Sequence, residues 1–155
     1  MLELNIRTFD NDTRKLVLDA IRRIVSGECC AAGSPKDPDF ELYDRYPLTT
    51  NDPDVTARVD EAFRSHFGEK ATTLDRQSAS EDFSEIADSL GIPYTYWGLG
   101  GIDPALYAKA GAAGTVSSDI PANHSPNFAP VITPTLQTGT AAIVVAALVW
   151  LKPSA

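Results

Sequence analysis

This sequence is short of the residues from which most metal and redox sites are built. Among 155 residues it has two histidines, His66 and His124, and two cysteines, which are adjacent. It contains no His-x-Asp, no His-x-Cys and no Glu-Glu pair. Neighbouring cysteines rarely pair with each other, and two thiols are too few for a structural zinc site. We interpret Cys29 and Cys30 as small buried hydrophobic residues in a reducing compartment, with a redox pair as the alternative.

Other absences exclude broad classes of function. There is no run of Lys or Arg, and the formal net charge is −8, which argues against a nucleic-acid partner. The N-terminus lacks a basic segment followed by an apolar one, so secretion is not indicated and we expect a cytoplasmic protein. The longest apolar run, Ala141–Leu151, is shorter than the ~20 residues that span a bilayer. We therefore expect a core helix there and no membrane partner.

The first 50 or so residues predict strand, helix and strand. Leu2–Phe9 alternates in polarity, and an apolar stripe from Leu16 to Val25 follows a cap at Asn11 or Asp12, with Gly33 as the stop. Residues 40–46 form the second predicted strand. Two strands and one helix cannot close a core of their own. We therefore expect a homo-oligomer, a dimer or larger, formed mainly through residues 2–46, because open strand edges drive pairing.

The second part mixes helices and strands in the manner of an α/β fold. After a polar hinge at residues 48–52, Pro53 begins a helix that ends at Gly68, and His66 beside its apolar face is expected to be a half-buried structural histidine. The remaining expected elements follow in order: a helix opened by a capping box at residues 78–81 and stopped at Gly91, a strand at residues 94–97, a short helix at 103–108, a loop at 116–122, and a last helix from Pro134 to about Leu151.

Four stretches carry candidate chemistry. His124 lies in a loop stiffened by Pro121 and Pro126, where an imidazole can serve as a metal ligand or proton carrier; a capping or core histidine is the alternative. Arg7, on the face of its strand opposite Leu4 and Ile6, could clamp a carboxylate with two parallel hydrogen bonds, or be solvated.

The other two stretches are acidic and glycine-rich. Ser80, Glu81 and Asp82 stand at a helix start, where they either line the mouth of a cleft or complement the helix dipole. Gly98, Gly100 and Gly101 either let the backbone approach a ligand closely or form a tight turn. The spacing of these glycines does not fit a nucleotide-binding loop.

Taken in order, these stretches resemble a known family. Leu-Asn-Ile-Arg-Thr-Phe-Asp with the following helix resembles the second half of the lid (dimerisation) domain of zinc-dependent aminoacylases and carboxypeptidases. Ser-Glu-Asp-Phe, Tyr-Trp-Gly-Leu-Gly-Gly and Asn-His-Ser-Pro-Asn-Phe resemble the C-terminal part of that family's catalytic domain. Within the family, hippurate and auxin-conjugate amidohydrolases are the most similar branch. One departure is Ala79, where a glycine is usual.

The resemblance implies a partial lid domain of ferredoxin-like type over residues 1–50 and the C-terminal part of an α/β metallopeptidase catalytic domain over residues 51–155. It assigns His124 as a metal ligand, Arg7 to the substrate carboxylate, residues 80–82 to the cleft and Gly98–Gly101 to a wall of the substrate pocket. Complete enzymes of the family are about twice this length and bind two zinc or manganese ions. Their other ligands, their glutamate general base and their lid histidine have no counterpart here.

We therefore expect the C-terminal portion of an amidohydrolase that cleaves the amide bond of N-acyl amino acids or short peptide-like substrates, and that is inactive as this chain alone. We expect His124 to face the concave side of the second part, within reach of Ser80–Asp82 and the Gly98–Gly101 turn. The alternative is a non-catalytic α/β assembly module that pairs through its exposed half-sheet.

Overall fold

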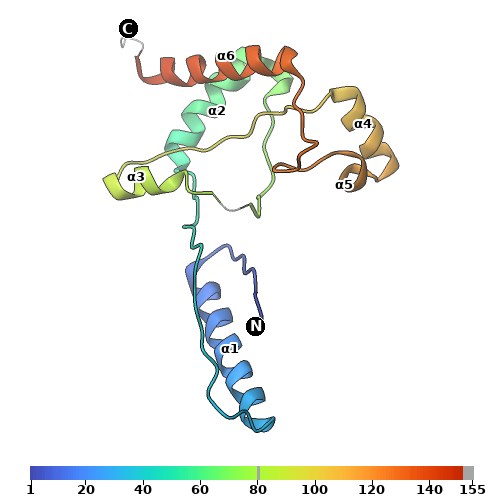
Figure 1. Ribbon diagram of the computed structural model, residues 1–155. Coiled ribbons are helices and arrows are strands. Elements are labelled where there is room, and N and C mark those ends of the chain that lie inside the picture. Colours follow the sequence, from blue (N-terminus) through green and yellow to red (C-terminus); the bar gives the residue numbers. More distant parts are fainter. Residues whose placement is uncertain (80, 152–155) are drawn as a thin grey trace. The chain divides into compact units, whose positions relative to one another are not determined.

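The computed structural model describes residues 1–79 and 81–151 (Figure 1). Within these residues the chain forms helices joined by turns and extended segments, and no β-strand. The elements are α1 (Asn11–Ala31), α2 (Pro53–Phe67), the 3₁₀ helix η1 (Gly68–Lys70), α3 (Ser84–Leu90), α4 (Pro104–Ala113), α5 (Val116–Asp119) and α6 (Ile132–Leu151). The expected α/β fold, with its ferredoxin-like partial lid domain and α/β catalytic portion, is therefore wrong for this chain.

The three predicted strands, residues 2–9, 40–46 and 94–97, fail for a common reason. A strand needs a neighbouring strand to bond its backbone N–H and C=O groups, and alternation of polarity alone does not supply one. Near residue 96 the backbone groups bond to a side chain and not to a neighbouring strand. The Asn51 side chain donates to the Tyr96 carbonyl (2.9 Å) and accepts from the Tyr96 N–H (2.7 Å). The Asp52 N–H donates to the Tyr94 carbonyl at 2.8 Å.

The chain divides into two compact units. The first contains residues 1–52 and 75–96, and the second contains residues 53–74 and the chain from Trp97 onward. The stretch that carries the Ser-Glu-Asp-Phe motif thus belongs with the N-terminal helix, outside the predicted 1–50 boundary.

In the first unit, α1 is defined by clear signals at both ends. The Asp10 carboxylate accepts from the backbone N–H of Thr13 (2.6 Å), and this bond holds the pKa of Asp10 below its ordinary value. At the other end Gly33 adopts a φ of 66°, and the Gly33 and Ser34 N–H groups donate to the Cys30 and Cys29 carbonyls. The predicted stop at Gly33 is confirmed, and the cap lies one residue before the predicted Asn11.

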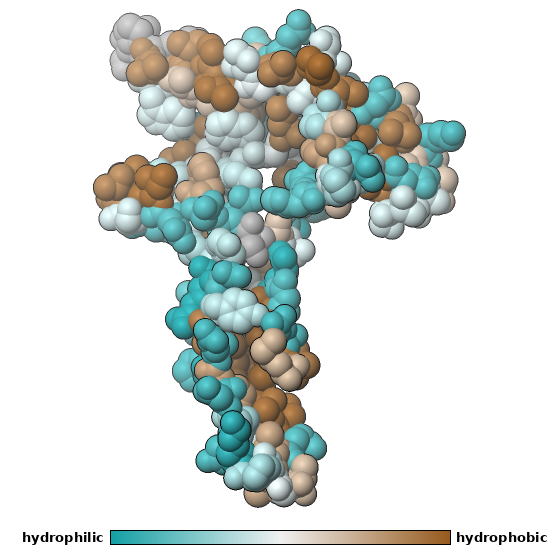
Figure 2. All heavy atoms as spheres, viewed as in Figure 1, coloured by the Kyte–Doolittle hydropathy of each residue, from teal (hydrophilic) through white to brown (hydrophobic). Residues whose placement is uncertain are grey.

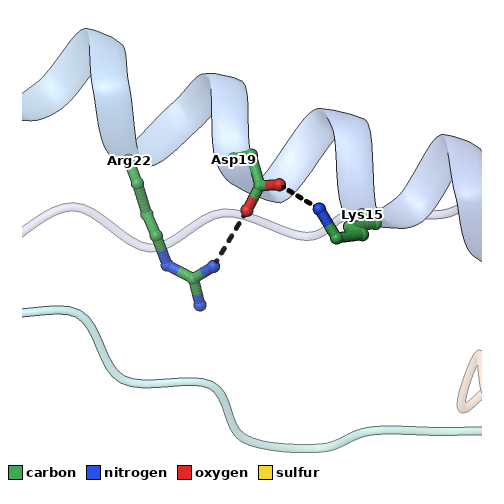
Figure 3. Close-up of polar contacts among 3 residues, drawn as sticks. All are labelled: Lys15, Asp19 and Arg22. Atoms are coloured by element: carbon green, nitrogen blue, oxygen red, sulfur yellow. Dashed lines mark hydrogen bonds and ion pairs between the residues drawn. The ribbon is translucent and has the colours of Figure 1, made fainter.

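The surface of α1 carries a small ion-pair cluster. The Asp19 carboxylate lies 2.8 Å from Lys15 Nζ and 3.5 Å from Arg22 Nη1, all three side chains being solvent-exposed (Figure 3). Exposed pairs of this kind contribute little to stability. No residue of α1 is fully buried, and the two cysteines expected to be buried are half-buried (Cys29) and exposed (Cys30).

In the second unit, α2 and α6 pack against each other. Val59 of α2 and Ala142 and Ala146 of α6 are buried, and Val55, Ala62, Phe63 and Phe67 of α2 are half-buried. Arg58 stacks over Trp150 and donates to the Val149 carbonyl at 3.1 Å. The predicted bounds of both helices agree with the structure, since α2 is Pro53–Phe67 and α6 is regular only after Thr133. His66, expected to be half-buried, is exposed and touches the Phe67 ring edge-on.

Shorter helices differ more from expectation. Helix α3 begins at Ser84, so the predicted capping box at residues 78–81 does not open it, whereas the stop at Gly91 (φ 62°) is confirmed. Helix α4 is capped by Asp103 and continues to Ala113, five residues beyond the predicted end. The expected loop at 116–122 contains the single-turn helix α5.

The chain buries few apolar side chains. Val59, Ala87, Ala110, Ala142 and Ala146 are the buried hydrophobic residues of the part described, and four of them are alanines. Large apolar side chains are exposed in each unit, among them Leu16 and Ile24 in the first and Leu136 and Ile143 in the second. Brown apolar surface is accordingly spread over both units (Figure 2). Much of this surface is therefore available to another polypeptide.

Helix α6 is long and apolar enough to cross a membrane, judged by length and composition only. Of the most apolar 18-residue stretch of this helix, 11% is buried inside the structure. Core helices of soluble proteins pass the same test of length and composition, so this is weak evidence for a span. Ala142 and Ala146 are buried and lie, at four-residue spacing, on the same face of α6 as Trp150, over which Arg58 of α2 stacks, while Ile143 and Val144 are exposed. Helix α6 therefore has one partnered face and one open apolar face.

Candidate functional site

Arg7 lies in the extended segment before α1, and its side chain reaches residues far along the chain. Its Nη1 donates to the Ser78 carbonyl, 71 positions away. Two residues on, the Phe9 ring lies under the Arg76 guanidinium, with 4.9 Å between Arg76 Cζ and the ring centroid. These contacts bring the first candidate stretch to residues 76–78, directly before the Ser-Glu-Asp-Phe motif.

The acidic stretch is the next part of the same unit. Ser80 lies outside the described residues. Glu81 is half-buried and interacts with the Tyr96 phenol. Partial burial raises the pKa of Tyr96 above its ordinary value, and the charge of Glu81 and a hydrogen bond to it raise it further. Asp82 is exposed, and its carbonyl accepts from the Glu85 N–H at 3.0 Å where α3 begins.

An aromatic cluster joins this stretch to the segment before the glycines. The Phe83 ring centroid lies 5.7 Å from that of Tyr94 and 4.9 Å from that of Tyr96. The Tyr94 hydroxyl in turn accepts from the Thr50 N–H at 2.9 Å. Glu81, Phe83, Tyr94 and Tyr96 therefore form one polar and aromatic surface in the first unit, with Arg7 held at the adjoining residue 78.

The three glycines belong to the second unit and differ in their surroundings. A Cβ on Gly98 would lie 3.1 Å from a methyl of Leu74, and one on Gly101 would lie 3.1 Å from Pro130 Cβ. A Cβ on Gly100 would meet nothing within 4 Å. Gly98 and Gly101 thus have a packing reason to be glycine, while the backbone of Gly100 is open.

Gly101→Ala should lower the free energy of unfolding by about 1 kcal/mol, because the new methyl meets a stiff proline ring. Gly100→Ala is the matched control and should change it by less than about 0.5 kcal/mol. Urea unfolding followed by circular dichroism measures both. Equal effects of the two substitutions would show that Pro130 does not restrict residue 101.

His124 lies in a loop built from two successive turns. The Ser125 N–H donates to the Ala122 carbonyl and the Phe128 N–H donates to the Ser125 carbonyl, both at 3.0 Å. His124 itself has a φ of 68°, in the left-handed region that non-glycine residues seldom adopt, and its side chain is exposed. Such a conformation costs on the order of 1 kcal/mol, and outliers of this kind are frequent at functional sites.

The glycine turn and the histidine loop are neighbours within the second unit. The Val131 N–H donates to the Gly101 carbonyl at 2.9 Å, next to the contact of Gly101 with Pro130. The glycine turn is thus hydrogen-bonded to the end of the loop that contains His124. Arg7, Glu81 and Asp82 belong to the other unit, so the expected approach of His124 to residues 80–82 stays a prediction.

The residues present do not fit the two-metal site that the resemblance implies. Within residues 1–79 and 81–151, no three His, Cys, Asp or Glu side chains lie together in a way that could hold a metal ion. One imidazole cannot by itself hold a divalent ion tightly. His124 could therefore serve only as one ligand of a larger set.

Sequence reasoning missed two residues of this surface. Asn51, assigned to a polar hinge, bonds both backbone groups of Tyr96 through its side chain. Tyr96, assigned to a strand, presents a phenol to Glu81. The one available signal was local: an Asn in a loop favours side-chain bonds to backbone over continued secondary structure.

No protein-family model matches this chain.

Proposed function

We propose that this chain is the C-terminal portion of a metal-dependent amidohydrolase that cleaves the amide bond of N-acyl amino acids. The observation that carries the proposal is the presentation of His124. An exposed imidazole stands at a left-handed residue within the first of two successive hydrogen-bonded turns, in a stretch that resembles the family's C-terminal ligand motif. The cost of that conformation is understandable if the ring has to be held for a ligand.

The exposed guanidinium and aromatic rings of the first unit support a role in substrate binding. One N–H of the Arg7 guanidinium is used by the Ser78 carbonyl, and a guanidinium has five N–H donors in a planar fork. We assign Arg7 to the carboxylate of the amino-acid product half. We assign Ser80, Glu81 and Asp82 to the cleft, and Gly98, Gly100 and Gly101 to a wall of the pocket. The Phe83, Tyr94 and Tyr96 rings would give an acyl group an apolar surface beside Glu81.

The proposal assigns the remaining zinc or manganese ligands and the general base to the rest of such an enzyme. Metal ions of this kind lower the pKa of a bound water and polarise a carbonyl when bound. Large apolar side chains are exposed in both units, among them Leu16, Ile24, Ile143 and Leu136, as expected of a polypeptide that completes its core with another. We also propose that the enzyme is homo-oligomeric and cytoplasmic, without nucleic-acid or membrane partners; the formal net charge of −8 disfavours a nucleic-acid partner.

The isolated chain should hydrolyse N-acyl amino acids no faster than buffer, and added zinc or manganese should not rescue it. A general base alone contributes roughly 10²–10⁴ in rate, and the missing ligands remove the nucleophile as well. The assay is hydrolysis of N-benzoyl and N-acetyl amino acids with metal analysis of the purified chain. A complete amidohydrolase of the family serves as the positive control. Metal-dependent turnover by the isolated chain, abolished by His124→Ala, would contradict the proposed division of the site.

A further inference from the structure

The aromatic cluster of the first unit, formed by Phe83, Tyr94 and Tyr96, exposes ring surface beside a carboxylate. Phe83 is 42% and Tyr96 41% exposed, and Tyr94 is half-buried. The Phe83 ring is inclined by 77° to the Tyr94 ring and by 44° to the Tyr96 ring, so the rings are not stacked in parallel. The Tyr96 phenol is hydrogen-bonded to the half-buried Glu81. Ring surface therefore reaches the solvent next to a negative charge.

Hydrogen bonds from residues 50–52 fix the positions of the two tyrosines. The Tyr94 hydroxyl accepts from the Thr50 N–H at 2.9 Å, and the Tyr94 carbonyl accepts from the Asp52 N–H at 2.8 Å. The Asn51 side chain bonds both backbone groups of Tyr96. Both tyrosine rings contact the same Phe83 ring, so they lie on one side of their segment. A ligand on this surface would have little of the chain to order, which favours binding.

The charge around the aromatic cluster favours a cation. Residues 75–96 contain one basic side chain, Arg76, and its guanidinium lies over the Phe9 ring. The acidic residues of the same segment are Asp75, Glu81, Asp82, Glu85 and Asp88. In the part of the chain that the structure describes, the arginines stacked on rings are Arg76 and, over Trp150, Arg58. The rings of the aromatic cluster thus remain available to a cation from solution.

Ring surface with one carboxylate suits a particular kind of cation. Aromatic faces attract cations through the ring quadrupole, and quaternary ammonium groups are recognised in this way. A primary ammonium group is strongly hydrated, whereas a quaternary one has no N–H to donate and loses less on leaving water. We propose that the aromatic cluster, with Glu81 as the counter-charge, binds the quaternary ammonium group of a small molecule. Because the acyl group is assigned to the same rings, the cation would stand at the end of the acyl chain, and this assignment rests on the proposed function.

Titration of the purified chain with choline chloride tests the binding, with sodium chloride keeping the ionic strength constant. The N-methyl proton signal of choline should move upfield, because protons over a ring face are shielded. We expect a dissociation constant on the order of 1 mM. The neutral analogue of choline, with a tert-butyl group in place of trimethylammonium, should bind at least about tenfold more weakly, because it lacks the charge.

Three variants locate the site. Phe83→Leu removes the ring that both tyrosines contact and should weaken choline binding about fivefold. Glu81→Gln keeps the shape of the surface and should weaken it about threefold, so it decides the matter if Phe83→Leu lowers the helix content measured by circular dichroism. Tyr107→Leu removes an exposed ring from α4 in the second unit and is the matched control, which should bind choline unchanged.

The outcomes separate the cation site from the proposed activity. The absence of an upfield shift, equal binding of the neutral analogue, or equal effects of Phe83→Leu and Tyr107→Leu would each overturn the site. Choline binding needs no hydrolysis, so a failure of the proposed activity leaves this result unchanged. If the chain combined with the N-terminal portion of an amidohydrolase hydrolyses N-acyl amino acids without preferring an acyl group that ends in trimethylammonium over its tert-butyl counterpart, the assignment of the cation to the substrate is wrong.

Discussion

His124→Ala should abolish the activity that this chain supports when it is combined with the N-terminal portion of an amidohydrolase of the family. In the proposed site His124 is the ligand that this chain contributes, and even residues that only orient a ligand change metal affinity or activity by 10–100-fold. We therefore expect the hydrolysis rate of N-acyl amino acids to fall at least about 100-fold, together with loss of retained zinc or manganese.

His66→Ala is the matched control, because His66 is the other histidine of the chain and is also exposed. It lies near the end of α2, outside the histidine loop. The combined protein carrying His66→Ala should keep its metal and its rate. If His124→Ala and His66→Ala behave alike, His124 is not a ligand, and its left-handed conformation needs another explanation.

Ala142→Glu should disrupt the contact between α2 and α6, whereas Ile143→Glu should leave it intact. Ala142 is 5% exposed and faces α2, while the adjacent Ile143 is 65% exposed. A carboxylate without a partner in a buried apolar contact costs several kcal/mol, so we expect a loss of at least about 3 kcal/mol in the free energy of unfolding. The same charge at residue 143 stays in water.

Thermal and urea unfolding of the two variants, followed at the tryptophans, measures this difference. Trp97 and Trp150 both belong to the second unit, and Trp150 lies against Arg58 of α2. Similar losses in both variants would show that α6 does not present Ala142 to α2. Similar stability in both would show that α2 and α6 are not held together.

Helices were predictable from this sequence because their signals are local. Pro53 and Gly68 bound α2, the backbone bonds at Gly33 and Gly91 end α1 and α3, and the Asp103 side chain caps α4. All of these signals act within a few residues. Boundaries went wrong where a second local signal competed, as at α3, where the helix opens at Ser84 and not at the capping box.

Strands were not predictable in the same way because they depend on partners far along the chain. The segment at residues 94–97 has the right composition, but its backbone groups bond to Asn51 and Asp52, which composition does not reveal. Alternation at residues 2–9 indicated which side chains share a face, without saying what covers them. Because the predicted strands do not form, the predicted α/β fold class was wrong as well.

The candidate site was predictable as separate stretches, and its assembly was not. Sequence reasoning singled out Arg7, Glu81 and His124, but not the contact of Arg7 with residue 78 or the cluster of Phe83 with Tyr94 and Tyr96. Those contacts join residues separated by 11 to 71 positions, so no local pattern encodes them. The left-handed conformation of His124 likewise depends on the turns around it.

The measurement that tests the account most directly is metal-dependent hydrolysis of an N-acyl amino acid by this chain mixed with the N-terminal portion of a family amidohydrolase, compared with each part alone. We predict that the mixture forms a complex, retains zinc or manganese and hydrolyses the substrate at least about 100-fold faster than either part. A complex that forms without retaining metal, or two parts that do not associate, would contradict the proposal that this chain completes an amidohydrolase.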